Sequence, residues 1–255
     1  MSEIKNEIYS SQMNQFESYR YGKPVGGTEY IFNKYYINAS TEPSGTFFVY
    51  TPTLADVFIV AGGGHGGIEG GAGAGAGGII FKSILLSTGE YEVIVGHGGA
   101  PGHPQSDSNS SFYGNIAIAG GVGNQYGTWL PSSNGGSGGG GHESAVPGQG
   151  IPGQGYDGGV GRAGGGSSSP GTNVGGTGTD MSTYFGTTVG DDGWFASGGG
   201  SAGSVGTPPK GGGGMGDENG MASTGGGGGG SPGINYTAGG SGIVLIRYLT
   251  ADFGI

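Results

Sequence analysis

The chain has 255 residues, of which 70 are glycine, 12 are proline and none is cysteine. Its formal net charge of −10 at pH 7 disfavours binding to nucleic acids and to anionic membrane surfaces, because the phosphate groups of both would repel it. Without cysteine, neither a disulfide framework nor a thiolate metal site is available, so packing, hydrogen bonds or partner chains have to stiffen the glycine-rich sequence.

Residues 1–22 form a polar arm that carries several aromatic side chains and no proline. An extended conformation and an imperfect helix are both compatible with its pattern. The arm has no apolar core of signal-peptide length, and the chain has no apolar stretch long enough to cross a membrane. We expect the arm to attach the protein to other chains and residues 23–255 to form one glycine-rich β domain.

Seven segments rich in β-branched and aromatic residues predict strands. They cover residues 28–38, 45–51, 57–61, 78–86, 90–95, 111–119 and 243–248. The short connection at residues 87–89 indicates a hairpin between the fourth and fifth of them. The simplest topology returns the last strand to the sheet of the early strands. We therefore predict an all-β fold, an antiparallel β-sandwich of jelly-roll type.

Residues 120–242 form a long excursion before the last strand, in which apolar side chains are isolated among glycines. Each glycine costs an α-helix about 1 kcal/mol relative to alanine, and glycine does not recur at every third position as collagen requires. We predict a bundle of polyproline-II-like glycine helices, whose bare faces let neighbouring backbones touch. Its structural core is predicted to contain Gly62, Gly63, Gly64, Gly77, Gly78, Gly225, Gly226, Gly227 and Gly228.

Large side chains isolated within the glycine-rich sequence are the candidate recognition residues. Their alternative role is to fill gaps beside the glycine helices. Residues 128–131 and 191–195 each join a tryptophan to residues that favour turns, and the second segment adds two carboxylates. Rigid aromatic faces lose little entropy when they contact a sugar or a protein. The candidates are Tyr126, Trp129, Tyr156, Asp191, Asp192, Trp194 and Phe195.

The sequence predicts no catalytic, cofactor-binding or metal site. Residues 62–67 match the dinucleotide-binding pattern G-x-G-x-x-G after a strand, but the glycine that follows excludes the helix needed to bind a pyrophosphate. Four histidines lie next to glycine and would bind a metal only if the fold gathered them, whereas hydrogen bonding on turns explains them equally well. They are His65, His97, His103 and His142.

Several segments follow one another in a characteristic order between about residue 44 and residue 248. They are Gly-Thr-Phe-Phe-Val-Tyr-Thr-Pro, Asp-Val-Phe-Ile-Val-Ala-Gly-Gly-Gly, Gly-Glu-Tyr-Glu-Val-Ile-Val-Gly-His-Gly-Gly and, last, Ala-Gly-Gly-Ser-Gly-Ile-Val-Leu-Ile-Arg-Tyr. This order resembles the glycine-rich domains of phage and virus structural proteins. Similar segments occur in the tail-fibre adhesins of T-even phages and in the ectodomain of the anaplastic lymphoma kinase receptor, where glycine helices form hexagonal bundles. The resemblance implies a non-enzymatic virion component and transfers no binding residues.

We therefore expect a virion protein made in the host cytoplasm, either a surface fibre or a host-attachment component. One alternative is a capsid cement or decoration protein that binds only other virion proteins, and a second is an ice- or surface-binding protein. The expected partners are other virion proteins, contacted through the arm, and a glycan or protein of the host surface. Nucleic acid, membrane insertion and cofactors are not expected. A multi-copy assembly is expected, with a homotrimer as one option.

Overall fold

The computed structural model describes residues 16–22, 29–36, 44–125, 127, 132–142, 145–204 and 208–249, and only the backbone of residues 16–22 and 29–32. Nearly all its regular elements are β-strands, so the expected all-β class is confirmed. The elements are β1 (Phe16–Gly22), β2 (Glu29–Tyr36), β3 (Ser44–Val49), β4 (Thr53–Val60), β5 (Ile79–Leu86), β6 (Gly89–Ile94), a 3-10 turn (Gln105–Ser108), β7 (Ser110–Phe112), β8 (Asn115–Ala117), β9 (Thr179–Asp180), α1 (Ser182–Phe185), β10 (Trp194–Phe195) and β11 (Ile243–Leu249).

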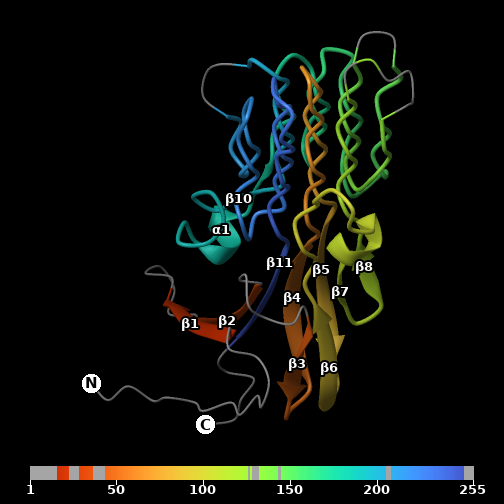
Figure 1. Ribbon diagram of the computed structural model, residues 1–255. Helices are drawn as coiled ribbons and strands as arrows, with labels where there is room; N and C mark the ends of the chain where they lie inside the picture. The colour runs from red at the N-terminus through yellow and green to blue at the C-terminus, as the bar shows by residue number, and fades with distance from the viewer. Residues whose placement is uncertain are drawn as a thin grey trace.

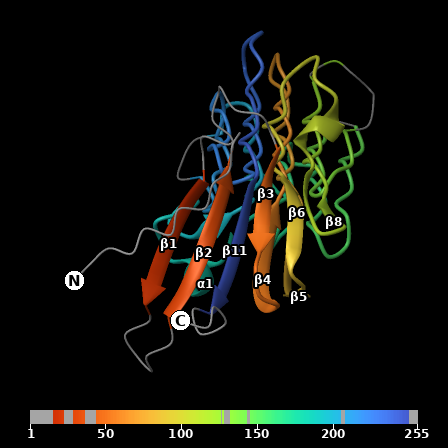
Figure 2. The same ribbon diagram turned by 90° about the horizontal axis from the view of Figure 1, so that it is seen from below.

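Two antiparallel sheets hold the main strands (Figure 2). The five-stranded sheet has the order β1-β2-β11-β4-β5, and the four-stranded sheet has the order β3-β6-β7-β8. In the larger sheet Val244 lies opposite both Tyr35 of β2 and Ile59 of β4. The last strand thus returns to a sheet of early strands, as predicted, and the structure adds that it is inserted between β2 and β4.

The central strands of the five-stranded sheet bury both of their faces, which explains their nearly continuous apolar sequence. On one face, Val57 and Ile59 of β4 join a cluster with Phe47, Val93 and Phe112 of the four-stranded sheet. On the other face, Phe58 and Val60 belong to a second cluster, which includes residues of the excursion around α1 and β10. The two clusters hold both sheets and part of the excursion together.

Two details of the predicted strands are wrong. Residues 111–119 form two strands, β7 and β8, because Tyr113 (φ 47°) and Gly114 (φ 71°) make a tight turn with two successive positive φ angles. Residues 87–89 do not close a hairpin, since β5 pairs with β4 while β6 pairs with β3 and β7. That connection instead carries the chain from one sheet to the other.

The described part of the N-terminal arm is an edge strand. Phe16 of β1 lies opposite Tyr35 and Gly22 lies opposite Glu29, so residues 16–22 are extended and belong to the five-stranded sheet. Residues 1–15 and 250–255 lie outside the described residues.

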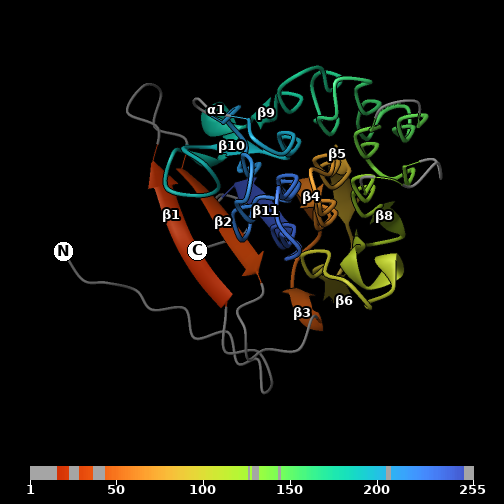
Figure 3. The same cartoon turned by 45° about the horizontal axis from the view of Figure 1, so that its top comes forward.

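The glycine-rich connections extend from one end of the sheets (Figure 1), and in Figure 3 they form a cluster of coils. Residues 72–78, which we call the central run, show how these segments contact one another. The N–H groups of residues 72, 75 and 78 donate to the carbonyls of residues 124, 121 and 118. The N–H groups of residues 73 and 76 donate to the carbonyls of residues 162 and 165. The N–H groups of residues 74 and 77 donate to the carbonyls of residues 228 and 225. Along the central run, N–H groups that are three residues apart thus donate to the same neighbouring segment.

The carbonyl groups of the central run contact three further segments. Those of residues 72 and 75 accept hydrogen bonds from residues 67 and 64, and those of residues 73 and 76 accept from residues 140 and 137. The carbonyl of residue 74 accepts from Gly199. The central run is therefore surrounded by six segments, five of them distant in sequence and one, residues 64–67, just before it in the chain, and its backbone groups are satisfied between segments.

Candidate binding groove

An open groove of about 530 Å³ lies where the start of β5 meets the glycine-rich excursion. Its lining contains three glycines, at positions 150, 153 and 155, and otherwise combines apolar surfaces with a few polar groups. These other lining residues are Ile79, Pro152, Tyr156, Asp157, Ser167 and Pro170. Of the sequence-predicted recognition residues within the described ranges, only Tyr156 lines the groove.

The loop that carries the groove is fixed at both ends. The Gly150 N–H donates to Oδ1 of Asp157 over 2.8 Å, which closes the loop. The side-chain amide of Gln154 accepts from the Ile118 N–H at 2.9 Å and donates to the Ile116 carbonyl at 3.1 Å. Because these two bonds imitate the pairing of a neighbouring strand, Gln154 holds the loop against the end of β8.

Tyr156 combines a fixed backbone with an accessible side chain. Its N–H donates to the Gly166 carbonyl at 3.1 Å and its carbonyl accepts from the Gly138 N–H at 3.0 Å. The side chain is 49% exposed. Within the part of the chain that the structure describes, the ring contacts no other aromatic ring and the hydroxyl makes no hydrogen bond. The ring is therefore available to a ligand without rearrangement of the loop.

The predicted segment 191–194 is a tight turn outside the groove. Asp192 (φ 52°) and Gly193 (φ 86°) are its central residues, and the N–H and C=O groups of Asp191 and Trp194 exchange hydrogen bonds of 3.0 Å. Oδ2 of Asp191 accepts from the Gly211 N–H at 2.8 Å, so this carboxylate has a structural role. Asp192 is exposed, with its carboxylate 3.8 Å from Nζ of Lys210.

The other predicted recognition residues that the structure describes do not form one surface. Phe195 is fully buried, with its ring 5.2 Å from that of Phe58, so the expectation that it is presented to a partner is wrong. Trp194 is half-buried on β10, opposite Asp180. Side chains alternate in direction along a strand, which explains why neighbours on β10 have different environments. Tyr126 and Trp129 lie outside the described residues.

The glycines predicted to form the structural core are all buried between backbone segments. A Cβ atom built on any of them would come within 3.0 Å of another part of the chain, and for eight of the nine that part is backbone. At Gly78 the nearest atom belongs to the side chain of Gln154. These glycines are Gly62, Gly63, Gly64, Gly77, Gly78, Gly225, Gly226, Gly227 and Gly228.

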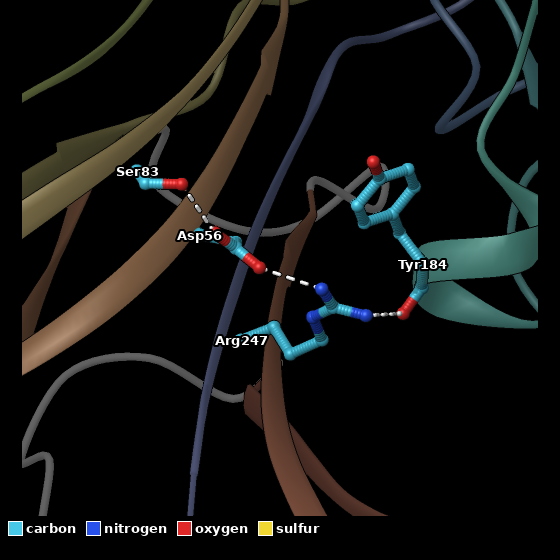
Figure 4. Close-up of polar contacts among 4 residues, drawn as sticks. All are labelled: Asp56, Ser83, Tyr184 and Arg247. Carbon is cyan, nitrogen blue, oxygen red and sulfur yellow. Dashed lines mark hydrogen bonds and ion pairs between the residues drawn. The ribbon is translucent and has the colours of Figure 1, made fainter. Parts of the chain in front are cut away.

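The sequence interpretation missed a polar cluster that joins the five-stranded sheet to the excursion (Figure 4). Nη2 of Arg247 lies 2.6 Å from Oδ2 of Asp56, and Nη1 donates to the Tyr184 carbonyl at 3.0 Å. The guanidinium lies 4.9 Å from the centre of the Tyr184 ring, and the Ser83 hydroxyl donates to Oδ1 of Asp56 at 2.6 Å. The sequence signal for this cluster was a charged residue within each of two apolar strands. Because Asp56 and Arg247 are 191 positions apart, this signal did not identify them as partners.

The histidines differ in their environments. His65 is partly buried, its Nδ1 lies 3.1 Å from the Gly66 carbonyl oxygen, and its ring contacts that of Tyr236 edge to face. Burial lowers the pKa of His65, and the contact with the Gly66 carbonyl opposes this only in part. His97 and His103 are exposed, whereas His142 is buried. Among the described residues, no three histidine or acidic side chains are grouped as a metal ion would require.

No helix in the described ranges has the length and apolar character needed to cross a membrane. A search of curated proteins finds no relative that matches the chain. The family described as "Glycine-rich domain" matches residues 41–249, which include the strands from β3 to β11 and the whole glycine-rich excursion. The chain therefore belongs to the glycine-rich domain family.

Proposed function

We propose that this chain is a non-enzymatic structural protein of a virion surface, in which a β-sheet base carries a stiff stem of packed glycine helices. The observation that carries the proposal is the hydrogen bonding of the central run, which repeats every three residues and reaches six neighbouring segments. A polyproline-II helix has three residues per turn and no internal hydrogen bonds, so its backbone groups depend on neighbours. The pattern supports a polyglycine bundle.

The packing supports a mechanical role for the stem. Ala72, Ala74 and Ala76 of the central run are completely buried, and the glycines between them lie against neighbouring backbone. A bundle with several hydrogen-bonded neighbours for each helix resists bending, because bending would break many of these bonds together. Such a stem would keep its loops at a fixed distance from the sheets, as a surface fibre or host-attachment component requires.

The base would provide attachment to the particle. The apolar cluster shared by the two sheets supports a β-sandwich, and the jelly-roll type remains part of the proposal. In the described part of the structure β1 is paired on one side only, by β2, and an exposed strand edge can pair with another chain. We propose that residues 1–22 contact other virion proteins in a multi-copy assembly, with a homotrimer as one form.

A second candidate is a cement or decoration protein that binds only other virion proteins. It is favoured by Leu54 and Leu85, which lie opposite each other on β4 and β5 and are 57% and 69% exposed. Adjacent exposed leucines are typical of surfaces that bind another protein. In that case the sheet face that carries these leucines, and not the groove, would bind the other virion proteins.

Mass spectrometry and immunogold labelling of particles purified from cells that produce the protein test the virion proposal. The protein should be present at a fixed ratio to the major structural protein, and absence from purified particles would end the proposal. An adsorption assay separates the two candidates. Free protein should reduce particle attachment to host cells if it is an attachment component, and it should have no effect if it is a cement protein.

A further inference from the structure

We propose that the groove beside Tyr156 is a binding site for a neutral saccharide. This inference rests on the proposed role in attachment and specifies the ligand. The volume of about 530 Å³ falls within the roughly 300–1,000 Å³ that is typical of small-molecule sites. The apolar and polar groups of the groove, its charge and its rigidity each limit the class of ligand.

The apolar surfaces of the groove suit the face of a sugar ring. Tyr156 presents an aromatic ring, and Pro152 and Pro170 present exposed pyrrolidine rings beside it. One face of a pyranose ring carries mainly C–H groups, which pack on flat apolar surfaces. Tyrosine adds a hydroxyl at the wet end of such a contact, so one side chain both stacks and hydrogen bonds.

The polar groups of the groove are mainly hydrogen-bond acceptors. Oδ1 of Asp157 is held by the Gly150 N–H, and Oδ2 takes no hydrogen bond from the described residues. A free carboxylate oxygen accepts strongly from a hydroxyl group. The Ser167 hydroxyl donates to the Phe195 carbonyl at 3.3 Å and lies 2.9 Å from the Thr179 hydroxyl, so it offers a ligand a further acceptor. A ligand with several adjacent hydroxyls matches this set.

The charge of the groove excludes anionic ligands. Among the residues that the structure describes, the lining contains Asp157 and neither lysine nor arginine, in a chain with a net charge of −10. A phosphate or an acidic sugar would therefore bring like charges together. A proline-rich peptide is the main competing ligand, because such peptides bind aromatic-lined grooves. The single tyrosine and the free carboxylate favour the saccharide.

The groove is formed before a ligand binds. The bonds of Gln154 to β8 and of Asp157 to Gly150 fix the loop, and the backbone of Tyr156 is bonded on both sides. Binding then costs little additional ordering of the protein. We therefore expect measurable binding of individual small sugars, at about millimolar dissociation constants, which correspond to about −4 kcal/mol.

The experiment is a titration of the purified full chain with neutral hexoses, N-acetylhexosamines and their disaccharides, followed by ligand-observed NMR and calorimetry. At least one sugar should bind, and Tyr156→Ala should weaken its binding about tenfold, as expected from loss of a stacking contact. Asp157→Asn keeps an oxygen for the Gly150 N–H and should also weaken binding. Tyr50→Ala is the matched control, since Tyr50 is 69% exposed and stacks on Phe48, on the four-stranded sheet.

Three outcomes would overturn the inference, the last of them measured in a parallel titration with a proline-rich peptide. They are the absence of binding by every sugar up to about 10 mM, equal binding by the wild type and Tyr156→Ala, and binding of a proline-rich peptide in place of sugars. The titration uses free protein, so it is independent of the particle analysis. Sugar binding by a protein that is absent from virions would retain this site and end the virion proposal.

Discussion

Substitution of Gly227 by alanine tests whether bare backbone contacts hold the glycine-rich segments together. A Cβ atom on Gly227 would lie within 3.0 Å of the Ala74 carbonyl group and 2.9 Å from the Gly199 nitrogen. The Ala74 carbonyl accepts from the Gly199 N–H at 2.9 Å, and the Gly227 N–H donates to Ser197 at 3.0 Å. To admit a methyl group, the segments have to move apart and lengthen both bonds.

The expected loss of stability follows from these contacts. Overpacking costs about 1–3 kcal/mol, and each weakened buried hydrogen bond costs about 1 kcal/mol more. We therefore expect Gly227→Ala to lower the free energy of unfolding by roughly 3–5 kcal/mol, a large part of the roughly 5–15 kcal/mol of a typical domain. Valine, with a β-branched side chain, should be more damaging. Urea unfolding followed by tryptophan fluorescence measures the change.

Gly233→Ala is the matched control for this substitution. The closest atom to a Cβ on Gly233 is the Ser231 hydroxyl oxygen at 3.7 Å, which is ordinary van der Waals contact, and neither Gly227 nor Gly233 has a positive φ angle. The control should be neutral, or stabilising by up to about 1 kcal/mol, because alanine has fewer unfolded conformations. If Gly227→Ala unfolds within about 1 kcal/mol of the control, the contacts between segments do not hold the excursion together.

Three other measurements address the remaining contacts. Arg247→Met should destabilise the protein by about 1–3 kcal/mol, because it leaves the half-buried carboxylate of Asp56 without its cation. The control Lys210→Met removes the exposed partner of Asp192 and should cost under about 1 kcal/mol. Equal effects of the two substitutions in urea unfolding would contradict this prediction. Phe195→Ala should cost about 3–5 kcal/mol as a buried ring is lost, and a melting temperature close to that of the wild type would mean that the ring is not part of the core. Because burial lowers the pKa of His65, the folded state binds this proton less tightly than the unfolded chain, so unfolding becomes easier as the pH falls below about 6.5. His65→Gln should reduce the loss of stability between about pH 7.5 and about pH 5.5, and an unchanged loss would exclude His65 as its source.

The sequence alone determined the β class and the approximate positions of the strands. Strands of the sheets' core carry consecutive β-branched and aromatic residues, as in residues 57–60, and this local signal does not depend on which strand is the partner. The glycine content excluded long helices from the excursion, and α1, with four residues, lies in a segment without glycine. The predicted return of β11 to the early strands also followed, since the chain has few other apolar segments after residue 120.

Pairing between distant residues could not be predicted in the same way. The assignment of β5 and β6 to different sheets depends on which apolar face each strand buries, and so short a connection is compatible with both a hairpin and a crossover. The turn at Tyr113 was missed because tyrosine rarely adopts a positive φ angle, and the hairpin geometry imposes it.

The candidate site shows the same division between local and tertiary information. Tyr156 and Phe195 are both bulky residues among glycines, and the local sequence does not distinguish them. Such a side chain must either fill a gap or face solvent. The tertiary structure decided between these roles: Phe195 lies over Phe58 of the sheet, whereas Tyr156 lines a groove that Gln154 and Asp157 hold open. In the central run the backbone groups bond to other segments, so neighbouring segments determine which of its faces is buried. The sequence therefore determined which residues were available for recognition, and the packing of distant segments determined which of them reach the surface.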